Sequence, residues 1–239
     1  MDDVVWALIE TVPTHAYRCK LLIQQGEHAS PSEVKRLHRD LLVLRSRFET
    51  WFSAFQCDFR DGPFTLRPAT YYASDILPDC FQFIDLLIAD TCVSYWVYLF
   101  VLCRWALRLQ TAFATTLFTS PCTKHTTNDH FTSEDFVNAG HNVCRSAEFI
   151  FFWPNRGFDP LARIVAPLRL VFEGFWDYPD VYDQELRWCW TVMEDVVARE
   201  PQGVMAKHFA TSFLGHPRKP HGVDEEKGVD DQRVADFAA

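Results

Sequence analysis

The chain has 239 residues, which is enough for one or two domains with a sizeable core. Hydrophobic residues make up 48% of it and aromatic residues 15%, a composition too apolar for a disordered protein. Acidic residues number 32 against 23 basic ones, and the resulting formal charge of −9 offers no electrostatic footprint for wrapping nucleic acid. With only 9 glycines, long helices are favoured over a turn-rich sandwich or barrel.

The first quarter of the chain predicts helices. Residues 4–25 are expected to form one or two short helices interrupted at Pro13. Residues 31–55 are expected to form an amphipathic helix, with Ser30 as its N-cap and Glu33 completing a capping box. The apolar residues of this helix recur at spacings of three and four: Val34, Leu37, Leu41, Leu44, Phe48, Trp51 and Phe55.

The middle of the chain predicts a loop followed by a long apolar helix. Residues 58–77 contain Gly62, Pro63 and Pro68, which favour a loop, and no segment of the chain is typical of a strand. Asp79 is the expected cap of a helix over residues 80–115 that is apolar nearly all round. Its uninterrupted apolar part, residues 93–103, is too short to cross a bilayer, which takes about 20 residues. We therefore expect a buried core helix and no membrane contact.

The remainder of the chain predicts more helices. A polar loop is expected over residues 119–132, and Pro167 predicts a kink or break in one of the helices that follow. Those helices are expected at 132–152, 159–175, 179–200 and 204–213. The expected fold is all-α, a multi-helix bundle or irregular helical array. It consists of one domain over residues 1–213 and a disordered tail over 214–239.

The cysteines favour a reduced, intracellular protein. The chain opens with Met1, Asp2 and Asp3 rather than with the basic and apolar regions of a signal peptide. The eight cysteines are scattered, mostly among apolar residues, where a free cysteine behaves as a small buried hydrophobe.

Catalytic motifs are absent from the sequence or incomplete. It contains no phosphate-binding glycine loop, no Gly-x-Ser-x-Gly and no His-Glu-x-x-His. An aromatic all-α protein raises the possibility of a terpene-cyclase-like magnesium site, but such a site needs clustered carboxylates. The candidate residues are too scattered to share helix faces: Asp85, Asp90, Asn142, Ser146 and Glu148. We expect no catalytic residues.

A metal site is the next hypothesis, and the spacing does not favour it. Five possible ligands fall close together in the sequence: Cys122, His125, His130, His141 and Cys144. His141 and Cys144 are three residues apart on one predicted helix face, but no second tight pair has the usual ligand spacing. We expect ordinary helix residues and solvated loop histidines, with no metal and no cofactor.

Two further patterns allow a structural and a binding interpretation. The acidic–aromatic stretch from Phe172 to Tyr178 is expected to place its rings in the core and its carboxylates at a solvated rim, with a partner-binding patch as the alternative. Basic residues on the predicted helix at 31–55 are interleaved with acidic ones, which favours a solvated face over a nucleic-acid stripe: Lys35, Arg36, Arg39, Arg45 and Arg47.

A series of loose motifs in the second half is similar to a known family. After the aromatic block at residues 95–100 come the segment 143–149 (Val-Cys-Arg-Ser-Ala-Glu-Phe), then Pro167-Leu168, then Glu185-Leu186-Arg187-Trp188. This order resembles the C-terminal regulatory region of the fungal-specific transcription factors with a zinc binuclear cluster. The resemblance spans residues 31–213 and is strongest over 136–199. It implies an all-α regulatory domain that acts in the nucleus, or alternatively the cytoplasm, through protein or small-ligand contacts.

The chain departs from that family where DNA binding is concerned. The zinc cluster needs six closely grouped cysteines, and here consecutive cysteines are at least 11 residues apart. We therefore expect no direct nucleic-acid binding, and a protein partner or self-association instead. Two alternatives stay open. The chain could be a small-molecule-binding or enzymatic protein with an aromatic-lined cavity between the helices at 80–115 and 139–152, or a fragment of a longer transcription factor.

Overall fold

The computed structural model describes residues 3–118, 130–152 and 160–199. Within these ranges the chain forms seven α-helices, one short 3-10 helix and a two-stranded sheet. The predicted all-α class is confirmed, with the small sheet as an addition. The expected helix at 204–213 and the expected tail over 214–239 lie outside the described residues.

The first two long helices form a hairpin. Helix α1 (Asp3–Gln25) is continuous, so the interruption expected at Pro13 is wrong. Internal proline costs a helix about 3 kcal/mol, and the packing of α1 against α2 and α3 offsets this. The 3-10 helix η1 (Gly26–His28) connects α1 to α2 (Pro31–Cys57). Ser30 makes no capping bond from its side chain, so the expected capping box is also absent; its Oγ lies 2.9 Å from that of Ser32.

The predicted apolar face of α2 is confirmed. The apolar residues from Val34 to Phe48 that follow one another at intervals of three or four positions are buried, and so is Phe52. Trp51 and Phe55 are half-buried and stack with ring centroids 5.5 Å apart. The periodicity of the sequence therefore identified the side of α2 that packs on the protein.

A hairpin of two strands occupies the segment that was expected to hold no strand. Strand β1 (Phe64–Pro68) pairs antiparallel with β2 (Asp79–Phe83), in a register that places Phe64 opposite Phe83. The Phe64 and Phe81 rings both lie against Trp96, with centroids 5.4 and 5.0 Å from it. The alternation of Phe81 and Phe83 was the available signal, but the glycine and prolines nearby favoured a loop.

The central helix α3 (Leu86–Ala112) starts later than expected. Residues 79–83 belong to β2, so Asp85 rather than Asp79 caps the helix, and its carboxylate accepts the Ile88 N–H at 2.8 Å. The helix also ends earlier than predicted, at Ala112, and the short helix α4 (Ala114–Phe118) follows after Phe113.

Three helices complete the fold. Helix α5 (Ser133–Phe151) begins, as predicted, at Thr132, which forms a capping box with Asp135. Helix α6 (Pro160–Phe175) runs through Pro167 without the break that was one of the expectations. Helix α7 (Asp183–Arg199) starts later than predicted because residues 177–182 form hydrogen-bonded turns.

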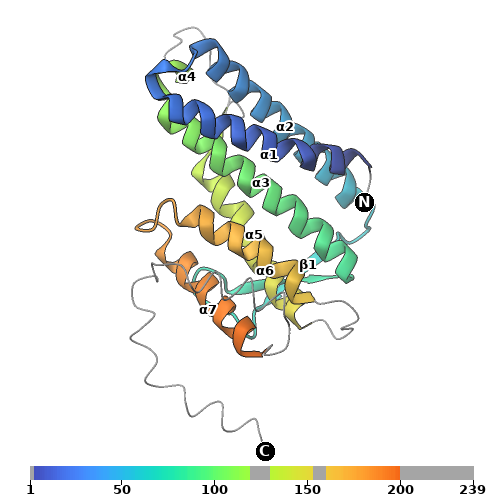
Figure 1. Cartoon of the computed structure of the whole chain (residues 1–239). Helices are drawn as coiled ribbons and strands as arrows, with labels where there is room; N and C mark the ends of the chain where they lie inside the picture. The colour runs from blue at the N-terminus through green and yellow to red at the C-terminus, as the bar shows by residue number, and fades with distance from the viewer. Residues whose placement is uncertain (1–2, 119–129, 153–159, 200–239) are drawn as a thin grey trace, which may run out of the picture.

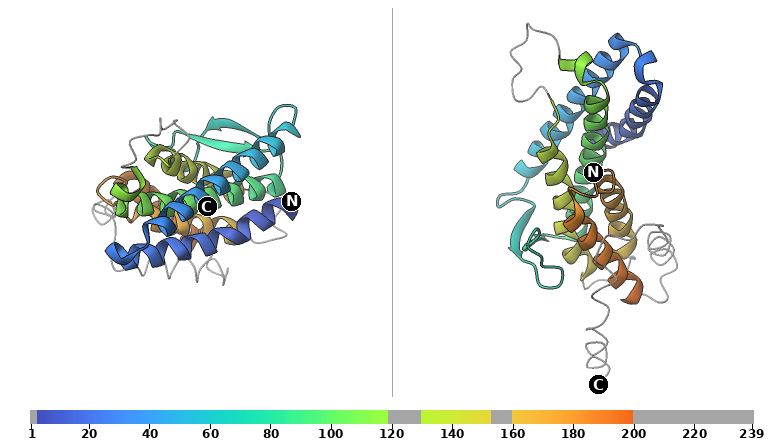
Figure 2. Two further views of the ribbon diagram at one scale, coloured as in Figure 1. Left: turned by 90° about the horizontal axis from the view of Figure 1, so that it is seen from above. Right: turned by 90° about the vertical axis from the view of Figure 1, so that its left-hand side faces the viewer.

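Helix α3 is shared by two groups of helices. It packs against α1 and α2 on one side and against α5 and α6 on the other, while α7 packs on α6 (Figure 1). Strands β1 and β2 lie against α5 on the side opposite α6 (Figure 2). By length and composition α3 could cross a membrane, but over half of its most apolar stretch is buried inside the protein. This burial fits the core helix that the sequence predicted.

Two glycines allow the aromatic core between α3, α5 and α6 to close. The rings of Phe100 and Phe136 stack with centroids 4.4 Å apart, and Phe175 meets both edge-on. A Cβ at Gly174 would lie 2.4 Å from the Phe100 ring, and one at Gly140 would lie 2.7 Å from the Phe175 ring. These helices can therefore approach only because both positions lack a side chain.

Candidate functional site

The carboxylate of Glu148 is a buried structural anchor. Only 2% of Glu148 is exposed, and Oε2 accepts the backbone N–H groups of Thr70 and Tyr71 at 3.0 and 2.9 Å. Arg67 lies 3.1 Å from its other oxygen. Burial acts to raise the pKa of Glu148, but these donors outweigh burial and lower it. The ionised carboxylate thus fastens the segment after β1 to α5.

The other residues of the hypothetical magnesium site are not brought together with Glu148. The Asp85 carboxylate caps α3, and Asp90 forms an ion pair with Arg163 of α6. Asn142 accepts a bond from Arg145, and Ser146 donates to the backbone oxygen of Asn142. Each of these side chains has a partner within the protein.

The residues considered as metal ligands also lie apart or outside the described ranges. Cys122 and His125 fall among residues that are not described. Nε2 of His141 lies 3.1 Å from the Glu185 carboxylate, whereas Cys144 is buried against Cys189 of α7. Over residues 3–118, 130–152 and 160–199, no group of three or more histidine, cysteine or acidic side chains is arranged to hold a metal ion.

The described cysteines are free thiols, and all except Cys57 are buried. Burial raises the pKa of Cys19 and of Cys92 to about 12. Burial, followed by the neighbouring Glu148 carboxylate, raises the pKa of Cys80 to about 11. A nucleophilic cysteine needs a lowered pKa, so these thiols have the properties of small core residues.

The acidic–aromatic stretch is largely structural. Phe172 and Phe175 are buried, and Trp176 stacks on Phe172 with centroids 5.4 Å apart. The carboxylate of Asp177 is not at a solvated rim as expected: it accepts two hydrogen bonds from Arg104 of α3, at 2.7 and 3.0 Å. This bidentate pair ties the end of α6 to α3.

Two of the five basic residues singled out on α2, Arg36 and Arg45, likewise pair with acids. Arg36 lies 3.8 Å from Glu33 on the same helix. Arg45 binds the Asp135 carboxylate of α5 through two bonds of 2.8 and 3.0 Å and also contacts Glu49. Asp135 is partly buried, which acts to raise its pKa, but its bonds to Thr132 and Arg45 lower it overall. Acidic residues interleaved with the basic ones along α2, Glu33 and Glu49, therefore form ion pairs with them.

A small pocket occupies part of the region in which an alternative ligand cavity was expected from the sequence. It lies among α2, α3 and α5, is lined by Tyr95, Trp96 and Asn142, and has a volume of about 250 Å³. Ligand sites usually measure roughly 300–1,000 Å³. The carboxylates that line it, those of Glu49 and Asp135, both contact Arg45.

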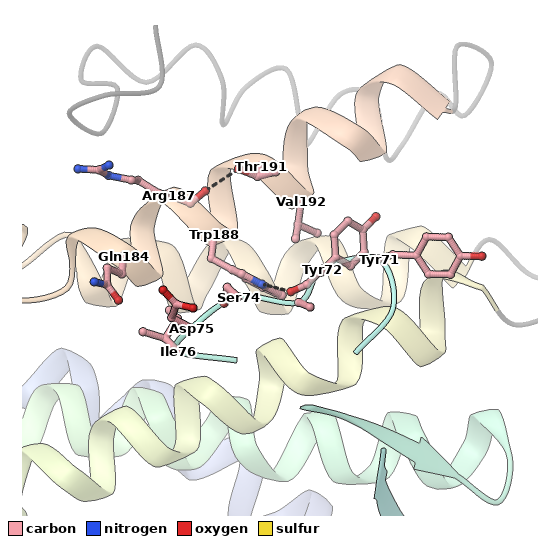
Figure 3. Close-up of a pocket in the computed structure, with 11 residues that line it drawn as sticks. Tyr71, Tyr72, Ser74, Asp75, Ile76, Gln184, Arg187, Trp188, Thr191 and Val192 are labelled. Atoms are coloured by element: carbon pink, nitrogen blue, oxygen red, sulfur yellow. Dashed lines mark hydrogen bonds between the residues drawn. The ribbon is translucent and has the colours of Figure 1, made fainter. Parts of the chain in front are cut away.

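A larger pocket of about 480 Å³ lies between the segment at residues 71–76 and α7. Figure 3 shows Asp75 and Gln184 near one end and Tyr71 near the other. The indole N–H of Trp188 donates to the backbone oxygen of Tyr72 at 2.8 Å and so joins the two sides (Figure 3). The lining combines rings with polar groups, a mixture typical of ligand pockets.

An apolar groove that was not predicted from the sequence runs along α3 between α1 and α6. It consists of two adjoining cavities, of about 380 and 350 Å³, that share Ser94 and Pro167. Its floor consists of residues of α3, its two walls of residues of α1 and α6: Leu87, Asp90, Thr91, Val93, Ser94, Val97, Tyr98 and Val101 of α3, Trp6, Val12 and Pro13 of α1, and Arg163, Ala166, Pro167 and Leu170 of α6. We call this the α3 groove.

Large apolar side chains are exposed along the α3 groove. Trp6 is 50% exposed, Leu87 69% and Leu170 38%. A monomer rarely leaves a contiguous apolar surface uncovered, so such a surface marks an interaction site. The available signal was the repeat of Leu87, Ser94 and Val101 at seven-residue intervals, which places them on one face of α3.

Comparison of the chain with protein-family models, curated proteins and solved structures finds no match.

Proposed function

We propose that this chain is a non-catalytic helical domain of the transcription-regulator type. It acts in the nucleus or cytoplasm through contacts with a protein or a small ligand, and it lacks a DNA-binding module of its own. The observation that carries the proposal is the contrast, among the described residues, between ionisable groups that have partners and an exposed apolar surface. The buried carboxylate of Glu148 is engaged by backbone donors, whereas the α3 groove exposes large apolar side chains.

The state of the ionisable groups supports a binding role over a catalytic one. General acids and bases need a pKa near the working pH, and nucleophiles need an activated form. Here the pKa values of Glu148 and Asp135 are lowered by structural bonds, and those of the buried thiols of Cys19 and Cys92 are raised. Each of these groups is therefore held in its resting protonation state.

The charge distribution supports contact with protein rather than with nucleic acid. The chain carries a formal charge of −9, and on α2 both Arg36 and Arg45 contact carboxylates. Binding to a nucleic-acid backbone requires clustered basic side chains that neutralise phosphates and so release the counterions condensed on the nucleic acid. The α3 groove instead offers apolar surface, which contributes roughly 25 cal/mol per Å² when a partner covers it.

A tethered-reporter assay tests the proposal. Fused to a heterologous DNA-binding module, the whole chain should change reporter expression at least threefold. A Leu87→Lys/Leu170→Lys variant should lose that effect while its expression level is unchanged. The control variant, Val43→Lys/Leu66→Lys, removes two exposed aliphatic side chains elsewhere and should retain the effect. Specific duplex binding by the unfused chain in a mobility-shift assay, or no reporter response, would contradict the proposal.

A small ligand in the pocket of Figure 3 is the second candidate, supported by the pocket's mixed lining of rings and polar groups. Thr191 lines this pocket and is exposed, so Thr191→Trp should fill it without disturbing the core. In a ligand-observed NMR screen of a polar fragment library, hits on the wild type should be lost in Thr191→Trp. Hits that persist in the variant would place binding elsewhere.

A further inference from the structure

We infer that the α3 groove binds one amphipathic helix of a protein partner, and that acidic side chains on this helix meet Arg108. The inference rests on the proposed function and specifies the partner.

The shape of the groove fits a helix. Helices α1 and α6 each pack on α3 and line the groove from its two sides (Figure 1). Val101 follows Leu87 by 14 positions, so the floor is about 21 Å long at 1.5 Å per residue, which accommodates roughly four helical turns.

The spacing and size of the floor residues also fit a helix. Leu87, Ser94, Val101 and Arg108 recur every seven residues, the repeat with which one helix presents a continuous seam to another. Where the two cavities join, they share the short side chains of Ser94 and Pro167, so the backbone of a docked helix can approach closely there. Trp6 and Leu170 lie at opposite ends of the groove. They can contact apolar side chains that recur every three or four residues on the docked helix.

The two charged side chains that line the groove, Asp90 and Arg163, form an ion pair with each other, so the charge that favours an acidic partner lies just beyond the lining, at Arg108. Arg104 and Arg108 both reach Asp177, but Arg104 holds that carboxylate at 2.7 Å whereas Arg108 lies 3.5 Å from it. Two guanidinium groups therefore share one carboxylate, one heptad beyond Val101. Arg108 is also held over the Trp105 ring, 4.8 Å from its centroid, so its position is set before binding. A carboxylate on the partner would complete the pairing.

The charge of the whole chain disfavours a second copy as the occupant. Each copy carries a formal charge of −9, so two copies repel one another at long range. The same charge disfavours an anionic lipid surface. An acidic helix is attracted locally by Arg108 in spite of the overall charge, which predicts modest affinity with a clear dependence on this residue.

The test is a display selection of 18-residue helical peptides, with apolar residues at three and four spacing and randomised polar faces, against the whole chain. We expect the selected peptides to be enriched in Asp and Glu. Leu87→Lys/Leu170→Lys should weaken their binding at least tenfold, about 1.4 kcal/mol. The matched Val43→Lys/Leu66→Lys control should change it less than twofold. All four substituted positions are exposed, so both variants should fold, as circular dichroism can verify.

The charge prediction has its own variant. Arg108→Glu should weaken binding of the selected acidic peptides about three- to tenfold and strengthen binding of the same peptides with Lys in place of Glu. Equal binding of acidic and basic peptides by the wild type would overturn the charge assignment.

The remaining outcomes each overturn the inference. They are the absence of any enriched peptide, and peptides that bind the groove variant as well as the wild type. A wild-type dimer in sedimentation equilibrium that becomes monomeric in the groove variant would assign the groove to a second copy. Groove-dependent binding to phosphatidylcholine–phosphatidylserine vesicles would assign it to a membrane. If no helical peptide binds the groove of the wild-type chain but the reporter response persists, the proposed function stands and only the partner is wrong.

Discussion

The two sides of α3 differ in how completely they are covered. On the side facing α5 and the hairpin, Trp96 and Phe100 are buried and in contact with other rings. On the side of the groove, Ser94, Tyr98 and Val101 are only partly covered, and Leu87 is exposed. Because α3 is apolar nearly all round, its composition does not distinguish the two sides. The difference shows that a helix apolar on nearly every face can be buried on one side and partly exposed on the other.

The largest loss of stability is expected from a substitution at Glu148, which holds the segment after β1 against α5 on the covered side of α3. Glu148→Gln removes the charge that Arg67 and three backbone N–H groups face, and should lower the free energy of unfolding by about 3 kcal/mol. Chemical denaturation measures this. Glu173→Gln, which removes one side of an exposed pair with Arg169, is the control and should cost less than about 0.5 kcal/mol.

The next largest effect is expected where α6 meets the Phe100 ring. Gly174→Ala places a Cβ 2.4 Å from that ring and should destabilise the protein by about 1–3 kcal/mol. In a double-mutant cycle with Phe100→Leu, the cost of Gly174→Ala should fall by at least half because the smaller side chain makes room. An unchanged cost would show that the backbone at Gly174, and not the ring, sets the penalty.

Carboxylates on the covered side of α3 should account for most of the stability that the protein loses in acid. The folded-state pKa values of Glu148 and Asp135 are lowered, so their contribution is complete above the unfolded pKa values near 4. It is lost as the pH falls through the lower, folded values. Unfolding free energy should therefore decrease below about pH 4.5, and the decrease should be shallower in Glu148→Gln. Parallel pH profiles of the two proteins would exclude Glu148 as a source.

The smallest effect is expected in the groove. Leu87→Ser changes a side chain that is 69% exposed and should alter the free energy of unfolding by less than about 0.5 kcal/mol. A loss of 2 kcal/mol or more in denaturation would mean that Leu87 contributes to the core, and the contrast between the two sides of α3 would disappear at that position.

Local patterns in the sequence were sufficient where one helix face is apolar. The three-and-four spacing of Val34 to Phe48 identified the buried face of α2, and Thr132 marked the start of α5. The same reasoning failed where distant residues decide the outcome. Pro13 lies inside a continuous helix, and residues 79–83 form a strand, because partners elsewhere in the chain stabilise both arrangements.

The candidate site was less predictable than the fold. Glu148 was noticed in the sequence, but its bonds to residues 70–72 depend on a segment about 78 residues away. The α3 groove was missed because its walls come from α1 and α6, which are separated by more than a hundred residues. The likeness of the 143–149 segment to fungal regulators stays a prediction.

The sequence by itself determined the helical class, the amphipathic face of α2 and the location of α5, because each depends on the order of neighbouring residues along one helix. Only the tertiary structure decided which side of α3 is covered, which carboxylates are paired and where an apolar groove stays open. Those outcomes depend on how helices far apart in the chain approach one another, and on two glycines that let Phe100 fit between α5 and α6.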